Sequence, residues 1–265
     1  MLNTLRAPSE NRLFFKGDKV SQPIVPFSQD VIVVGMPNSG KSTLFNSLIQ
    51  SLASPTSIYP GTTNIVITGC VSQDNHQLAS PTSIYPGTTN MVISGCVSQD
   101  YHQLVLKDTP SCLKVLKDID FDELDRILYI SNVDDKRIEE KELELMEFVY
   151  AQKLPITLVF SRSDDLTNAS LLDAKKQMYQ NIFRQRMDEI HFLVSGYKGF
   201  NIANLRNFLF SKCLKREWKY NATDKLIMSD VEKLNLIVRE KVLRSIPTFL
   251  DQNFDQVTVE AYNDS

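Results

Sequence analysis

The stretch that decides the fold reads Asp30-Val-Ile-Val-Val-Gly-Met-Pro-Asn-Ser-Gly-Lys-Ser-Thr43. Its first half is an all-apolar run, which is typical of a strand buried on both faces of a parallel sheet. Its second half, Gly35 to Ser42, satisfies the pattern GxxxxGK[ST]. An amphipathic helix is predicted next, over residues 41–50. The flanking strand and helix favour a loop that wraps a polyphosphate over a chance turn rich in glycine and serine.

Each residue type in this loop has a chemical role. Glycine lets backbone N–H groups turn toward phosphate oxygens, and the helix N-terminus adds partial positive charge. Lys41 is expected to reach the β- and γ-phosphates of a nucleotide, and Ser42 to ligate Mg²⁺. The predicted nucleotide-binding residues of the loop are Gly35, Asn38, Ser39, Gly40, Lys41, Ser42 and Thr43.

Strands and helices alternate along the chain beyond this loop. Further strands are predicted at residues 103–107, 127–131, 156–160 and 190–194, and helices at 135–152, 168–187 and 201–213. Because parallel neighbours need long crossovers, this alternation predicts an α/β fold with a doubly wound, mostly parallel sheet. Ligands of such sheets bind at the carboxyl ends of the strands.

Composition narrows the class of protein. Of 265 residues, 42% are hydrophobic and 23% charged, which is typical of globular chains. The net charge of −3 argues against strong general affinity for nucleic acid, so any RNA contact must be local. The four cysteines form no CxxC pair, which suits a reducing compartment and neither a disulfide framework nor a zinc site. No apolar run approaches the roughly 20 residues of a membrane span.

A tandem repeat interrupts the pattern. Residues 52–77 recur as 78–103 with three differences, Ile65/Met91, Thr68/Ser94 and Asn75/Tyr101. Two copies exclude a solenoid. Near identity indicates a recent duplication or an error in the gene model, and the sequence leaves both open.

The string GMPNSGKSTLFNSL resembles the phosphate loop of the Era-type ribosome-assembly GTPases, where it reads GxPNxGKSTLxN. The resemblance extends over about residues 30–262 and divides the chain into an irregular extension (1–29), a G domain (30–213) and an incomplete KH-like domain (214–265). It implies GTP or GDP with Mg²⁺ as ligands, the small ribosomal subunit or its rRNA as partner, and a monomer.

The family's switch I threonine, which closes over Mg²⁺ and the γ-phosphate, is matched twice. Tyr-Pro-Gly-Thr-Thr ends at Thr63 and again at Thr89, each at a family-like distance from a flanking motif. Both threonines cannot occupy one coordination site, so one copy is an insertion. The second copy is expected to pair with the next strand because it leads directly into residues 103–107. Which threonine meets the metal is left open.

The resemblance assigns the next motif to the metal and the γ-phosphate. In Asp108-Thr-Pro-Ser111, Asp108 matches the acid that holds Mg²⁺, while Ser111 replaces a glycine whose N–H contacts the γ-phosphate. The short stretch between Ser111 and the strand at 127–131 leaves little room for a switch II helix. Cys112 stands where Ras-like proteins place a water-orienting glutamine. Weakened switching is expected.

Two segments resemble the guanine-binding motifs NKxD and SAxxGxNV. In Ser161-Arg-Ser-Asp164, Asp164 would accept two hydrogen bonds from guanine that adenine does not offer, and Arg162 would cover the base. Ser161 is shorter than asparagine and is expected to lose a contact that braces the phosphate loop. Backbone N–H groups of Ser195 and Gly196 are expected to meet guanine O6. A merely solvated turn is the alternative at Asp164.

The resemblance also assigns catalytic groups and the carboxyl-terminal part of the chain. Asn38 matches an asparagine that binds a catalytic K⁺ in some relatives, although a turn-stabilising role explains it equally well; with Thr63 and Thr89 it completes the catalytic candidates. Residues 216–262 resemble the linker, first helix and first strand of a KH domain, but the RNA-gripping GXXG loop does not follow. A basic cluster there is interpreted as a solvated helix end rather than an RNA contact: Lys212, Lys215, Arg216 and Lys219.

The leading hypothesis is therefore an Era-type GTPase with weak hydrolysis that assists small-subunit assembly. The alternatives are a non-hydrolysing G domain that serves as an interaction module, and a truncated gene product. The amino-terminal extension fits a mitochondrial presequence or an untargeted tail equally well. Together with the duplication and the degenerate motifs, it favours mitochondria over a bacterial cytoplasm.

Overall fold

The computed structural model describes residues 20, 22–49, 92–111, 113–133, 140–165, 169–223 and 226–227. Thr63, Thr89 and Cys112 lie outside these residues, as do the predicted KH-like helix and strand. None of the helices within these ranges is both long and apolar enough to cross a membrane.

Eight strands form one mixed sheet in the order β6-β5-β4-β1-β3-β2-β8, with β7 paired to β1. The strands are β1 (Phe27–Gly35), β2 (Ile93–Gln99), β3 (His102–Asp108), β4 (Arg126–Asn132), β5 (Ile156–Ser161), β6 (Phe192–Leu193), β7 (Leu214–Lys215) and β8 (Leu226–Ile227). The ladders β1–β3, β1–β4, β4–β5 and β5–β6 are parallel, and those of β2, β7 and β8 are antiparallel. This confirms the predicted mostly parallel sheet.

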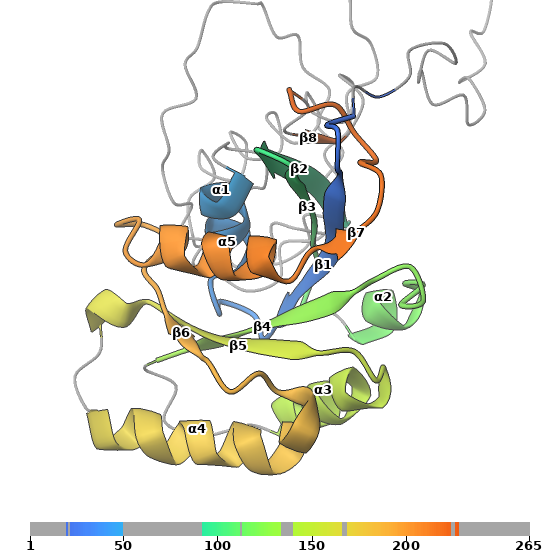
Figure 1. The fold of residues 1–265 in the computed structure, drawn as a ribbon. Helices are drawn as coiled ribbons and strands as arrows, with labels where there is room; N and C mark the ends of the chain where they lie inside the picture. The colour runs from blue at the N-terminus through green and yellow to red at the C-terminus, as the bar shows by residue number, and fades with distance from the viewer. Residues whose placement is uncertain are drawn as a thin grey trace, which may run out of the picture.

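Helices cover both faces of the sheet (Figure 1). They are α1 (Lys41–Ile49), α2 (Leu113–Lys117), α3 (Glu140–Ala151), α4 (Ala169–Phe183) and α5 (Ile202–Ser211), with 3-10 turns η1 (Ser163–Asp165) and η2 (Arg184–Arg186). Helices α1 and α5 pack on one face, and α2, α3 and α4 on the other. The predicted alternation of helices and strands is confirmed, with ends that differ by a few residues.

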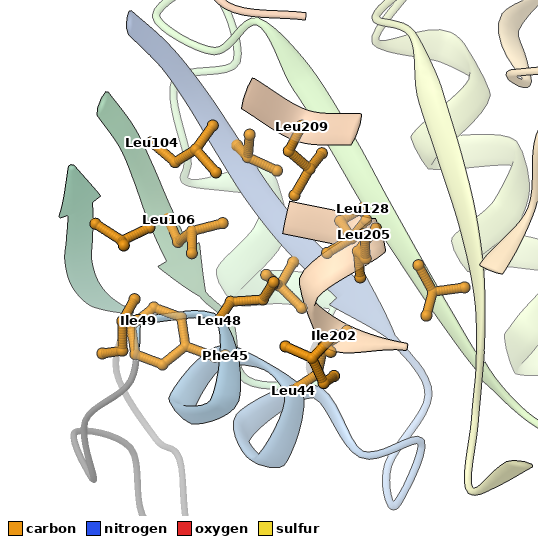
Figure 2. Close-up of a cluster of buried hydrophobic side chains, with 14 of the residues drawn as sticks. Leu44, Phe45, Leu48, Ile49, Leu104, Leu106, Leu128, Ile202, Leu205 and Leu209 are labelled. Carbon is orange, nitrogen blue, oxygen red and sulfur yellow. The ribbon is translucent and has the colours of Figure 1, made fainter. Parts of the chain in front are cut away.

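The apolar run of β1 explains this two-sided packing. Val31 and Val33 face the core beneath α1 and α5, whereas Ile32 and Val34 face the core beneath α2, α3 and α4. All four are completely buried, because successive side chains of a strand point to opposite faces. Figure 2 shows the first core, where leucines of α1, β3 and α5 meet.

The second copy of the repeat supplies β2, as predicted. Ile93 pairs with Asp108 and Gln99 with His102, and the hairpin turns at Asp100 with a φ of 54°. The described strand next to β3 is therefore encoded by residues 78–103.

Residues 214–220 form a strap across the amino ends of β1 and β3, and this corrects two expectations. The boundary at residue 213 is too early, because Leu214 and Lys215 pair with Ser28 and Phe27 inside the main sheet. Because Phe27 also pairs with His102, β1 begins there, so the irregular extension does not reach residue 29.

The interpretation of the basic cluster as a solvated helix end is wrong for Arg216 and Lys219, whereas Lys212 and Lys215 are exposed. Arg216 donates to Asp30 at 2.7 Å and to Asp125 at 2.6 Å, and Lys219 donates to Asp30 at 2.9 Å. The Asp30 side chain is only 2% exposed, so these cations neutralise a buried carboxylate. Trp218 adds a hydrogen bond from its ring nitrogen to the Phe27 carbonyl at 3.1 Å.

The cysteines of the described residues, Cys96 and Cys213, are thiols and form no disulfide there. Cys96 is buried in β2, and burial raises the pKa of Cys213 to about 12. Both behave as packing residues in this fold.

Candidate nucleotide-binding site

The predicted phosphate loop joins the carboxyl end of β1 to the amino end of α1. Asn38 and Gly40 adopt left-handed backbone conformations, with φ of 62° and 88°. A Cβ on Gly35 would lie 2.3 Å from the Ile130 carbonyl oxygen, so only glycine fits there. Ser39 is buried, and within the described part of the chain its hydroxyl has no hydrogen-bond partner. The loop thus exposes main-chain groups, and no large side chains, at the carboxyl ends of the strands.

Lys41 lies at the centre of the site with 7% of its surface exposed. Its ammonium donates to the carbonyls of Gly35 at 3.0 Å and Met36 at 2.9 Å, and to the hydroxyl of Ser111. Burial lowers the pKa of Lys41 to about 8, and the charge of Asp108 opposes that shift. The side chain therefore remains mostly protonated at neutral pH.

Ser42 and Asp108 form the predicted metal-binding pair. The Ser42 hydroxyl donates to Asp108 Oδ2 at 2.7 Å, and Asp108 is completely buried at the end of β3. Thr109 fixes the same turn by donating to the Val33 carbonyl at 2.7 Å. A hydroxyl and a carboxylate are oxygen ligands of the kind Mg²⁺ takes beside nucleotide phosphates, so the donor set fits that ion.

Ser161 makes the contact that it was expected to lose. Its hydroxyl donates to the Ser39 carbonyl at 2.5 Å. A Cβ on Gly40 would lie 3.4 Å from the Ser161 side chain, which shows how closely the end of β5 approaches the loop. Because the separation is so small, serine is long enough to replace asparagine as a brace.

The two predicted guanine-binding segments lie side by side. Asp164 accepts a hydrogen bond from the Ser195 hydroxyl and lies 3.4 Å from Lys198 Nζ. These contacts, the Ser195 hydrogen bond foremost, lower the pKa of Asp164. These contacts favour the ionised form of Asp164, which is exposed and follows the end of β5, close in sequence to the half-buried Arg162.

Of the two N–H groups predicted to meet guanine O6, those of Ser195 and Gly196, the backbone conformation favours Gly196. The Ser195 N–H donates to the Phe200 carbonyl at 3.2 Å, which leaves Gly196 as the candidate donor to guanine O6. Gly196 is also fixed to α1, because the Ser47 hydroxyl donates to its carbonyl at 2.9 Å. A Cβ here would lie 3.0 Å from Thr43 Cγ2, which explains glycine in place of the family's alanine.

The described site residues thus gather at one edge of the sheet, with three qualifications. Asn38 belongs to the loop but is exposed, and Thr63 and Thr89 lie outside the described residues. Sequence reasoning missed the hydroxyl of Ser111 as a partner of Lys41, because it treated Ser111 only as a lost glycine. It also missed Lys198 as a partner of Asp164. The position of this lysine inside the second guanine-binding segment could have indicated that contact.

The chain is similar in sequence to known GTPases. A family model described as 50S ribosome-binding GTPase matches residues 30–79. GTPase Era of Clostridium botulinum strain Hall is 29% identical over 216 residues, covering 81% of this chain and 65% of the relative. GTPase Era of Clostridium acetobutylicum is 28% identical over 227 residues, again covering 81% of this chain and 65% of the relative. The chain thus spans 65% of the length of these relatives.

Two solved structures share the fold. One is Era in complex with MgGDPNP and nucleotides 1506–1542 of 16S ribosomal RNA, with a TM-score of 0.64 and 20% identity; the match covers 84% of this chain and 69% of that one. The other is an Aquifex aeolicus Era variant bound to GDP.AlF4-, with a TM-score of 0.63 and 21% identity; the match covers 81% of this chain and 66% of that one.

Proposed function

We propose that the chain is an Era-type P-loop GTPase that binds GTP and GDP with Mg²⁺ and assists assembly of the small ribosomal subunit, as its similarity to GTPase Era supports. The observation that carries the proposal is the clustering of Lys41, Ser42 and Asp108 at the carboxyl ends of β1 and β3. A buried ammonium beside a hydroxyl–carboxylate pair suits a triphosphate and its metal better than any uncharged ligand.

Each described residue has a defined task in this proposal. Lys41 binds phosphate oxygens, while Ser42 and Asp108 hold Mg²⁺, which neutralises charge on the phosphates when bound. Asp164 reads the guanine edge, since adenine would leave its carboxylate without hydrogen-bond donors. The Ser195 hydroxyl orients that carboxylate. Thr63 or Thr89 would complete the metal site, and a K⁺ ion at Asn38 would add positive charge.

The decisive test is competitive binding on the full chain. With a labelled GTP analogue and Mg²⁺, GTP and GDP should displace the label at concentrations at least about 100-fold below those of ATP. Lys41→Ala should weaken binding by two orders of magnitude or so, because it removes a buried charge-assisted hydrogen bond to the phosphates. Lys141→Ala, on an exposed position of α3, removes the same charge far from the loop and should change nothing. Equal displacement by ATP would overturn the proposal.

A second candidate is a G domain that binds GTP without hydrolysing it and acts as an interaction module. The contact of Ser111 with Lys41 favours it, because a serine stands where the family uses glycine to meet the γ-phosphate. Single-turnover measurements separate the two. A rate above that of GTP in buffer favours the GTPase, and a rate equal to it favours the module.

The RNA partner and the compartment are also proposals. The Era structure with a 16S rRNA fragment supports small-subunit rRNA as the partner class, although residues 228–265 lie outside the described structure. Retention of the chain on small subunits in sucrose gradients, with GTP but not GDP, tests the partner. A mitochondrial location follows from the sequence argument alone, and microscopy of a carboxyl-terminally tagged full chain tests it.

A further inference from the structure

The three N–H groups of the Lys41 ammonium have three acceptors. Two are main-chain carbonyls, of Gly35 at 3.0 Å and of Met36 at 2.9 Å. The third acceptor is the side-chain hydroxyl of Ser111. Because an ammonium has three hydrogens, these contacts use its whole donor capacity.

The three acceptors differ in how easily they can be exchanged. The carbonyls belong to the end of β1 and the first turn of the phosphate loop, and Gly35 pairs with Ile130 in the β1–β4 ladder. Ser111 is exposed, and its hydroxyl moves by rotation about a single bond. The residues before it are anchored, since Asp108 accepts from Ser42 and Thr109 donates to Val33. The Ser111 hydroxyl is therefore the acceptor that a phosphate oxygen can replace at least cost.

We propose that Ser111 competes with nucleotide phosphate for Lys41 and so sets the affinity of the site for guanine nucleotides. The inference rests on the proposed function, in which Lys41 binds the phosphates. A phosphate oxygen must displace the hydroxyl, so breaking the hydrogen bond between Lys41 and Ser111 offsets part of the free energy of the new one to phosphate. Serine at this position thus weakens binding of any nucleotide whose phosphate reaches Lys41, which includes GDP as well as GTP.

The central test compares Ser111→Ala with the unmodified full chain. Alanine removes the hydroxyl but keeps the backbone restricted, so Kd for GDP and for GTP should both fall by about 10-fold, in titration calorimetry with Mg²⁺. Ser111→Thr retains a hydroxyl and should bind like the unmodified chain. Unchanged affinity in Ser111→Ala would overturn the proposal. So would weaker GTP binding with unchanged GDP binding, because it would make Ser111 a γ-phosphate ligand.

A second measurement needs no nucleotide. Acetylation of Lys41 by an amine-reactive reagent, followed by peptide mass spectrometry, should be faster in Ser111→Ala because the ammonium loses one acceptor. Ser211→Ala, at the end of α5, is a matched control that should leave the Lys41 rate unchanged. If Lys41 reactivity rises but no variant binds nucleotide, the proposed function fails while the Ser111 contact stands. If the unmodified chain binds GTP and neither readout moves, the Ser111 proposal alone fails.

Discussion

Asp164 and Ser161 show how single residues shape the site from opposite ends of one short segment. Ser161 donates a hydrogen bond to the Ser39 carbonyl of the phosphate loop, and Asp164 accepts one from the Ser195 hydroxyl. The identity of these residues follows from the sequence motif, but their contacts do not. Whether a serine reaches Ser39 depends on how far the end of β5 lies from the loop, and no local pattern encodes that distance.

The pKa of Asp164 leads to a prediction about pH. Because the Ser195 hydroxyl and, to a lesser extent, Lys198 lower this pKa, the carboxylate persists to a more acidic pH than a free aspartate. The preference for GTP over ATP should therefore be constant between about pH 5 and 8 and be lost only as the pH falls through the lowered pKa. Affinity ratios measured across this range check it. Ser195→Ala should move the loss toward higher pH, whereas loss of preference above pH 5 in the unmodified chain contradicts the assignment.

At the scale of elements, regular periodicity predicted the long strands and helices, because each carries enough residues for a repeat to be visible. The same method could not find β7 or β8, each of two residues, which exist only through pairing with β1 and β2. Nor could it predict the ion pairs of Arg216 and Lys219. Their carboxylate partners, Asp30 and Asp125, are separated from them in sequence and meet them only through the sheet.

The strap gives a stability prediction. Arg216→Ala removes a cation from Asp30 and Asp125, leaves the buried Asp30 with Lys219, and should lower the free energy of unfolding by about 2 kcal/mol. Urea denaturation measures the change. Lys215→Ala is the matched control, since Lys215 is the exposed neighbour in β7 and should cost less than about 0.5 kcal/mol. Equal effects of the two variants would mean that the ion pairs contribute nothing.

At the scale of the whole molecule, the α/β class and the order of elements could be predicted from the phosphate loop and the alternation that follows it. Of the antiparallel strands β2, β7 and β8, only β2 was predicted, as part of the hairpin that leads into β3. Two separate cores lie on the two faces of β1, so both of them anchor the strand from which the phosphate loop emerges.

The repeat gives a prediction at this scale. Deletion of residues 52–77 leaves the copy that forms β2, so the described fold should be retained, with an unfolding free energy within about 1 kcal/mol of the full chain. Circular dichroism and urea denaturation test this. Val97→Asp places a carboxylate in the buried part of β2 and should unfold the domain, which shows that the assay is sensitive. Loss of structure on deletion would mean that the first copy also supports the fold.

The hairpin of β2 and β3 has an evolutionary consequence. Both copies end in closely matching residues, so whichever copy directly precedes Leu104 supplies a matching partner strand for β3. A gene that gained the second copy would still have encoded the same sheet, and one that lost it again would do so too. Selection for a stable fold therefore does not distinguish one copy from two. Only selection on nucleotide binding or hydrolysis can distinguish them.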